Sequence, residues 1–74
     1  MPRLPLFKPR MVEKILLKNG FFVKRQTGSH RVYHNPETEK VVVVPFHSRE
    51  VARGTLRNIV RQSNLPDKAF RKRK

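Results

Sequence analysis

The stretch FFVKRQTGSHRVYHNPETEKVVVVP, residues 21–45, decides the fold that this sequence predicts. Residues 21–26 are rich in aromatic and β-branched side chains, and residues 41–44 are four consecutive valines. In residues 30–34 the side chains alternate between two faces, with His30, Val32 and His34 on one and Arg31 and Tyr33 on the other. Each segment is therefore typical of a β-strand. The connections at 27–29 and 35–39 are short and rich in turn-forming residues, which predicts an antiparallel meander of three strands. The run of valines further predicts that the third strand is well covered.

An amphipathic helix is predicted on each side of this meander. Residues 10–19 carry apolar side chains at helical spacing, and Gly20 supplies a stop signal. A second helical pattern follows Gly54, with Thr55 as the expected N-cap. The expected buried positions of the two helices are Val12, Ile15, Leu16, Leu56, Ile59 and Val60. Since each helix has one apolar stripe, the sequence predicts an α+β fold, an α-β-β-β-α two-layer sandwich with both helices on one face of the sheet. The other face is left to solvent or to a partner.

The length of 74 residues predicts a single domain spanning residues 1–74. Three prolines among the first nine residues predict an extended arm at residues 1–8. Residues 66–74 are expected to form a basic C-terminal tail that begins with a short turn or helix carrying Phe70. No stretch approaches the roughly 20 apolar residues of a membrane span, and we expect a soluble, cytoplasmic protein with no membrane partner.

The charge of the chain points to a polyanionic partner. Lys and Arg number 18 against 5 acidic residues, which gives a net charge of +13. Nucleic acid, an acidic protein and an anionic membrane all satisfy such an excess. The chain has no cysteine, so disulfides and thiolate zinc sites are excluded.

Two of the three histidines, His30 and His34, stand four residues apart in the second predicted strand. That spacing would bring them together on a helix, but on a strand it separates them by about 13 Å. Two imidazoles so far apart do not easily share one metal ion, and few carboxylates lie nearby. We therefore expect no metal site and no cofactor.

Acid–base chemistry fits His30 better than metal binding does. Imidazole titrates near neutral pH, and RNA carries its own nucleophile in the 2′-hydroxyl group. A base for that hydroxyl, cations for the phosphate and an acid for the leaving oxygen suffice for cleavage. Lys24, Arg25 and Arg31 lie close by in the hairpin and can hold phosphates. From these residues alone a second interpretation stays open and is favoured, in which His30 is a strand-edge residue hydrogen-bonded to the backbone.

Other polar and aromatic residues have weaker functional cases. Tyr33 can stack on a base or can be buried against a helix. His47, which follows the third strand, can be a second proton carrier or can fasten the loop, and the structural role is preferred. His34 adjoins a turn and is expected to face solvent. Gly28 is best explained by the backbone conformation of the turn.

Three segments together resemble a known family. They are LKNGFFVKRQTGSHRVYHNP at 17–36, VVVVPFHS at 41–48 and GTLRNIVRQSNL at 54–65. In this order and spacing they resemble the HicA toxins, the mRNA-cleaving partners of HicA–HicB toxin–antitoxin systems. The resemblance implies a fold like the double-stranded-RNA-binding domain. It also implies a metal-independent endoribonuclease that cuts mRNA and arrests translation until a HicB antitoxin covers its active site.

The resemblance assigns the catalytic histidine to His30, because Gly28 and Ser29 match the neighbours of that histidine in the family motif. The RNA-binding positions are then Lys24, Arg25, Gly28, Ser29 and Arg31, with Tyr33 and His47 as accessory candidates. The connection at 35–40 departs from the usual shorter turn of the family, which puts the geometry of that loop in doubt. Two alternatives remain, a non-catalytic RNA-binding module of the same fold and a basic partner of an acidic protein.

Overall fold

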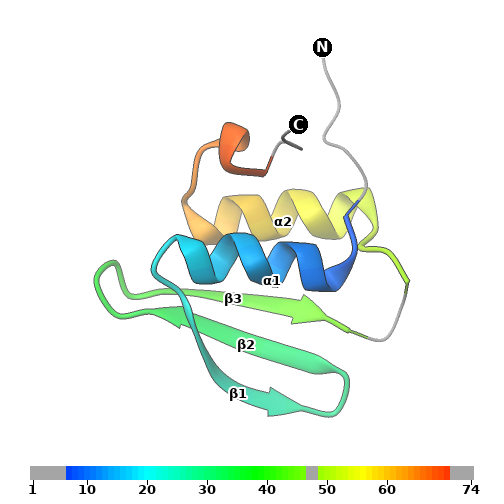
Figure 1. Ribbon diagram of the computed structural model, residues 1–74, viewed down its shortest axis with the longest axis horizontal. Helices are drawn as coiled ribbons and strands as arrows, with labels where there is room; N and C mark the ends of the chain where they lie inside the picture. The colour runs from blue at the N-terminus through cyan, green and yellow to red at the C-terminus, as the bar shows by residue number, and fades with distance from the viewer. Residues whose placement is uncertain (1–6, 47–48, 71–74) are drawn as a thin grey trace.

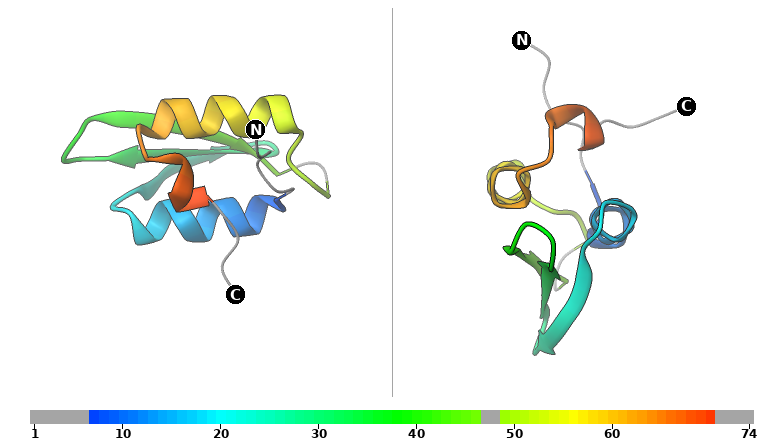
Figure 2. Two further views of the ribbon diagram at one scale, coloured as in Figure 1. Left: turned by 90° about the horizontal axis from the view of Figure 1, so that it is seen from above. Right: turned by 90° about the vertical axis from the view of Figure 1, so that its left-hand side faces the viewer.

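The computed structural model describes residues 7–46 and 49–70. The elements follow the order α1 (Pro9–Lys18), β1 (Phe22–Thr27), β2 (His30–Asn35), β3 (Lys40–Pro45), α2 (Arg53–Ser63) and a 3₁₀ helix η1 (Asp67–Phe70). The strands form one antiparallel sheet in the order β1-β2-β3. Both helices lie side by side over the same face of this sheet (Figures 1 and 2). The predicted α-β-β-β-α sandwich is confirmed.

Helix α1 ends where the sequence predicts. Gly20 adopts a φ of 91°, a left-handed conformation that glycine reaches without strain. The Phe21 N–H donates to the Leu16 carbonyl at 3.0 Å, a bond that closes the helix as in a Schellman motif. Phe21 is itself fully buried. Because its N–H is bonded to the end of α1, β1 begins one residue later than predicted, at Phe22. The turn therefore delivers an aromatic side chain to the core before the sheet starts.

The register of the sheet separates the valines of β3 into two sets. Val42 lies opposite Tyr33 and is fully buried beneath the helices, as is Val44. Val41 and Val43 point to the other face and are 44% and 41% exposed. The prediction that this strand is well covered is thus wrong. The helices cover only one face of the sheet, and alternate residues of a strand point to opposite faces.

Helix α2 buries Leu56, Ile59 and Val60, as predicted. It begins at Arg53, however, and its N-cap is Ala52, so the prediction that Thr55 caps the helix is wrong. The reason lies in tertiary structure. Val51 is buried in the core and forms an isolated antiparallel bridge with Phe7. That bridge fixes the backbone at Val51, two residues before α2, so the helix begins at Arg53.

The core lies between the helices and the sheet, and η1 closes it from the side opposite the sheet (Figure 2). Phe70 in η1 is fully buried, and its ring meets that of Phe7 edge-on, with 6.4 Å between the centroids. Most of the predicted arm and the terminal basic residues, at 1–6 and 71–74, lie outside the described residues. Within residues 7–46 and 49–70, no helix is long and apolar enough to cross a bilayer.

Candidate functional site

The Gly-Ser-His turn lies at the end of the sheet where β1 passes into β2. Gly28 has a φ of 58°, which suits the first central position of a two-residue hairpin loop. The Ser29 carbonyl accepts a hydrogen bond of 2.6 Å from the Phe46 N–H. His30 is exposed and pairs with Thr27 on one side and with Pro45 on the other. The turn is therefore fastened to the end of β3 while the His30 side chain stays accessible.

The two histidines of β2 share the face of the sheet that no helix covers. His30 is at the start of the strand and His34 near its end, with Val32 between them on the same face. His34 is half-buried, and its Nε2 lies 3.2 Å from the Glu39 carboxylate, so it is less open to solvent than expected. Among residues 7–46 and 49–70, no three His, Asp or Glu side chains are grouped closely enough to hold a metal ion.

Arg31 points to the opposite face and is engaged by several neighbours. Its Nη1 donates to the Glu13 carboxylate at 2.8 Å, and its Nε donates to the Gln26 side-chain oxygen at 3.0 Å. Its guanidinium also lies 4.3 Å from the centre of the Phe46 ring, a cation–π contact. The hydrogen bond that Arg31 donates to Glu13 raises the pKa of Arg31 above its ordinary value. These contacts hold Arg31 in one geometry at the junction of α1 and the sheet.

Tyr33 is fully buried, as the second of its two interpretations expected. Its hydroxyl donates a hydrogen bond of 2.6 Å to the same Glu13 oxygen that binds Arg31. Burial, followed by the bond to Glu13, raises the pKa of the Tyr33 phenol. With no exposed ring face, Tyr33 is not placed to stack on a base, and its role is to join β2 to α1.

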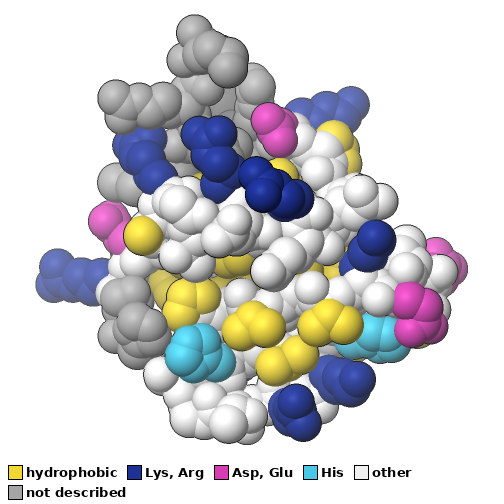
Figure 3. Space-filling view, turned by 180° about the vertical axis from the view of Figure 1, so that it is seen from behind, with side chains coloured by type: hydrophobic (Ala, Val, Ile, Leu, Met, Phe, Trp, Pro, Cys, Tyr) yellow, Lys and Arg dark blue, Asp and Glu magenta, His cyan; other side chains and the backbone are white. Residues whose placement is uncertain are grey.

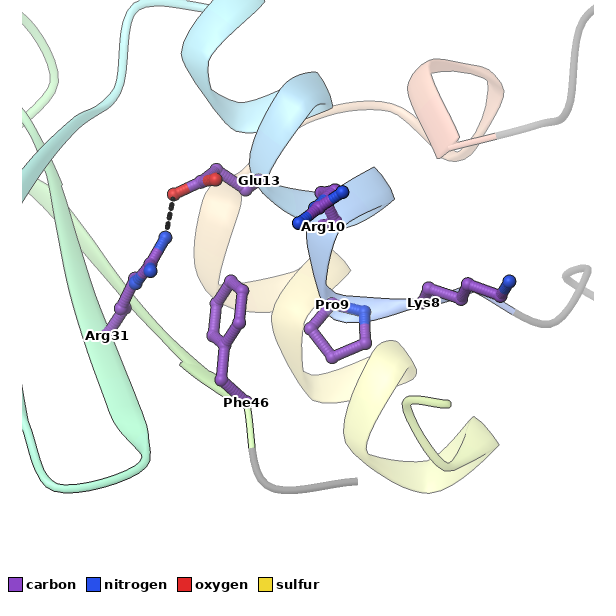
Figure 4. A pocket seen from close by; sticks show the side chains of 6 residues that line it. All are labelled: Lys8, Pro9, Arg10, Glu13, Arg31 and Phe46. Atoms are coloured by element: carbon purple, nitrogen blue, oxygen red, sulfur yellow. Dashed lines mark hydrogen bonds and ion pairs between the residues drawn. The ribbon is translucent and has the colours of Figure 1, made fainter. Parts of the chain in front are cut away.

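A shallow pocket of about 410 Å³ lies between the start of α1 and the end of the sheet. Its lining side chains are Lys8, Pro9, Arg10, Glu13, Arg31 and Phe46 (Figure 4). Three of these side chains are cations and one is an acid, so the pocket is positively charged. The sequence does not predict this grouping, because Lys8 and Arg10 are separated from Arg31 by about twenty residues and no local pattern connects them.

The remaining predicted residues are distributed along β1 and beyond. Lys24 falls within the irregularity between Val23 and Arg25, and Arg25 lies opposite Val32, on the open face. Both basic side chains are exposed, as Gly28 and Ser29 are. His47 lies outside the described residues. The structure thus brings the turn, His30 and the basic pocket to one end of the sheet, with Arg25 further along the open face.

Fold and site together define a small, strongly basic α-β-β-β-α domain with an exposed histidine at a glycine turn. A family model described as the HicA toxin of bacterial toxin–antitoxin systems matches residues 9–65, most of the chain. The chain therefore belongs to the HicA toxin family, which makes it a toxin of a toxin–antitoxin system. A search of curated proteins gave no match.

Proposed function

We propose that this toxin is an endoribonuclease that cuts mRNA, with His30 as its catalytic acid–base residue. The observation that carries the proposal is the exposed position of His30 beside the Gly28-Ser29 turn, in a chain of the HicA family. An exposed imidazole at the rim of a sheet can approach a nucleic-acid backbone. Imidazole is the side chain most often used to take or give a proton in general acid–base catalysis.

The chemistry needs only the chain, the substrate and solvent water. His30 takes the proton of a ribose 2′-hydroxyl, and the resulting oxygen attacks the adjacent phosphorus. The bond from phosphorus to the 5′ oxygen then breaks, and that oxygen takes a proton from solvent water as it leaves. The products are a 2′,3′-cyclic phosphate and a 5′-hydroxyl end. Nearby cations stabilise the additional negative charge on the phosphate in the transition state.

Two groups of cations support RNA binding near His30. Lys24 and Arg25 are exposed on β1, and Lys8 and Arg10 lie at the pocket beside α1. In this proposal they contact phosphates on either side of the cleaved bond, while the backbone at Gly28 and Ser29 lets the RNA approach closely. Arg31, which already binds Glu13 and Gln26, acts mainly by keeping the pocket in shape. A HicB-type antitoxin is the proposed protein partner.

The test compares two histidines of the same strand and the same face. His30→Ala is expected to lower the rate of RNA cleavage by about 100-fold or more, the usual contribution of a general acid or base. His34→Ala is the matched control and should leave the rate within about threefold of the native rate, well below such a contribution. Cleavage of a labelled RNA is measured for both, together with thermal unfolding to verify that each variant is folded.

Native activity in the His30→Ala protein would disprove the assignment, as would an equal loss in both variants. A substrate with 2′-deoxyribose at the cleaved position tests the chemistry separately, because it lacks the nucleophile. Cleavage of that substrate would exclude attack by the 2′-hydroxyl. Tight binding of RNA that stays intact with the native protein would favour the non-catalytic RNA-binding module instead.

A further inference from the structure

The basic pocket between α1 and the end of the sheet contains more than cations. Its wall also includes the Glu13 carboxylate and the half-buried Phe46 ring, and its volume of about 410 Å³ is in the range of pockets that hold small molecules. Figure 4 shows Arg10 and Glu13 on α1, above the Phe46 ring that follows β3. A ligand that fits the whole pocket therefore offers negative charge, an apolar surface and hydrogen-bond donors together.

Lys8 and Arg10 are the cations of the pocket that are available to a ligand. Both are exposed, and neither forms an ion pair within residues 7–46 and 49–70. Arg31, in contrast, is bound to Glu13 and lies against the Phe46 ring. The two exposed cations suit a phosphate group at the opening of the pocket.

Glu13 has hydrogen-bonding capacity left for a ligand. Its Oε2 accepts bonds from Arg31 at 2.8 Å and from Tyr33 at 2.6 Å, while its Oε1 accepts none from residues 7–46 and 49–70. In this part of the chain no fully buried side-chain oxygen lacks a partner, so Oε1 is accessible from outside. An ionised carboxylate only accepts hydrogen bonds, and the group that Oε1 binds is therefore a donor.

Guanine is the base whose edge best fits a carboxylate. Its N1–H and its N2 amino group are adjacent donors on the Watson–Crick edge. Adenine and cytosine have one amino group beside a ring nitrogen that is an acceptor, and uracil has one N–H between two carbonyl groups. Such acceptors would face the negative charge of Glu13. Single-stranded RNA is commonly recognised through this edge, with the base packed on an aromatic side chain.

We propose that the pocket binds a guanine base of single-stranded RNA, and that Glu13 selects this base. The base packs against Phe46, its two donors bind Glu13, and the phosphate of the same nucleotide lies on Lys8 and Arg10. This inference rests on the proposed function, since it names the kind of RNA that reaches His30. A phosphate alone is a poorer occupant, because it has no apolar surface for Phe46 and its oxygens would meet the Glu13 carboxylate.

The pocket is close enough to His30 for one RNA strand to reach both. Pro45 is the register partner of His30, with about 5 Å between the Cα atoms of such a pair, and Phe46 is the next residue. The Phe46 N–H also binds the carbonyl of Ser29, beside His30. His30 lies on the other face of the sheet, where two histidines flank exposed hydrophobic side chains (Figure 3). In this proposal the strand passes around the end of the sheet, and the guanine belongs to a nucleotide near the cleaved bond.

The experiment compares four RNA heptanucleotides that differ only in the central base and have uridine at every other position. Each ribose carries a 2′-O-methyl group, which removes the nucleophile, so the native protein binds these RNAs without cutting them. Because all four have the same phosphates, the differences between their affinities report the base alone. Fluorescence anisotropy measures each affinity, and the amide NMR shifts of Arg10, Glu13 and Phe46 locate the bound base.

Glu13→Gln is the test variant, and Glu37→Gln is its matched control. Glutamine keeps one oxygen for the bonds from Arg31 and Tyr33, but its amino group cannot accept from guanine. Glu37 is exposed in the connection between β2 and β3 and does not line the pocket, so its replacement removes the same charge elsewhere. Thermal unfolding verifies that both variants are folded.

Native protein and Glu37→Gln are expected to bind the RNA with central guanosine about fivefold or more tightly than the RNA with central uridine. This is the lower end of the discrimination that a bidentate pair of hydrogen bonds provides. In Glu13→Gln the ratio should fall below about twofold, since one bidentate partner is lost. Central inosine, which lacks the N2 amino group, should weaken binding to the native protein. That comparison needs no variant, so it decides the matter if Glu13→Gln does not fold.

Equal affinity for the four RNAs, or a guanine preference that persists in Glu13→Gln, would overturn the proposal. Inosine that binds as tightly as guanosine would do the same. Shifts at Arg10 and Phe46 that are identical for all four bases would identify the pocket as a phosphate site only. Because no RNA is cut in these titrations, ordinary RNA that stays intact with the native protein would disprove the endoribonuclease proposal alone. The guanine site would still be tested.

Discussion

At the scale of single residues, Glu13 connects the helix layer to the sheet. One oxygen of its carboxylate accepts hydrogen bonds from both Arg31 and Tyr33, which are two positions apart on β2. Hydrogen bonds to a charged group are stronger than those between neutral groups. The alternation of side chains along β2 places Arg31 on the helix side of the sheet, and the bond to Glu13 then fixes its guanidinium there.

We expect Tyr33→Phe to lower the free energy of unfolding by about 2 kcal/mol, because it removes a buried hydrogen bond to a carboxylate. The pKa of Tyr33 is raised in the folded protein, so the native state holds the phenolic proton more tightly than the unfolded state. The stability from this group is complete below the unfolded pKa of about 10 and is lost as pH rises above it. Denaturant unfolding of both proteins from pH 8 to about 11 measures the difference.

The difference in stability between native protein and Tyr33→Phe should therefore shrink as pH rises above about 10. Comparing the two proteins at each pH cancels the titration of the many lysines. A difference that stays constant over this range would show that the phenol does not titrate differently in the two states. A difference that grows would contradict the direction of the pKa change.

At the scale of the elements, both helices begin without a side-chain cap. The N-caps are Lys8 and Ala52, and neither makes a side-chain hydrogen bond to its helix among the described residues. Neither helix has an acidic residue in its first turn, where a negative charge would be favourable. Tertiary contacts, such as the bridge between Phe7 and Val51, set where these helices start.

Ala52→Ser is expected to stabilise the protein by about 1 kcal/mol, because Ala52 already has the extended N-cap backbone, with φ −60° and ψ 149°. Thr55→Ala should change stability by less than about 0.5 kcal/mol, since Thr55 lies inside α2 and does not cap it. Thermal and denaturant unfolding measure both changes. A large loss in Thr55→Ala, with no gain in Ala52→Ser, would indicate that Thr55 caps the helix in solution and that the helix starts at Leu56.

At the scale of the whole molecule, the chain carries 18 Lys and Arg residues against 5 acidic ones, and its net charge is +13. The pocket at the start of α1 and the exposed part of β1 both contribute to this charge. The face of the sheet opposite the helices differs, because Phe22, Val41 and Val43 are exposed there. RNA binding, which depends on the positive charge in the proposed function, should therefore respond strongly to salt.

We expect RNA affinity, measured with the His30→Ala variant so that the RNA stays intact, to fall roughly 100-fold between about 50 and 200 mM salt. This corresponds to about five phosphate contacts on single-stranded RNA. Fluorescence anisotropy at several salt concentrations measures this affinity. RNA affinity that is independent of salt would contradict binding through phosphates.

Local patterns were enough to predict the order of the elements. The helical spacing of Val12 and Leu16, the stop at Gly20 and the alternation around His30 each depend on residues that are near one another in the chain. Such patterns also identified the glycine turn that presents His30. The family resemblance, carried by three segments, was confirmed by the match over residues 9–65.

The sequence by itself therefore determined the secondary structure order, the two-layer architecture and the position of His30 in a turn, because these follow from short-range periodicity and backbone preference. Tertiary structure alone decided which valines of β3 stay exposed, where α2 begins and how Glu13 joins Arg31 to Tyr33. It also decided that Phe46 and the start of α1 meet in one basic pocket. These features depend on contacts between residues far apart in the chain, whose pairing becomes fixed only when the helices pack on one face of the sheet.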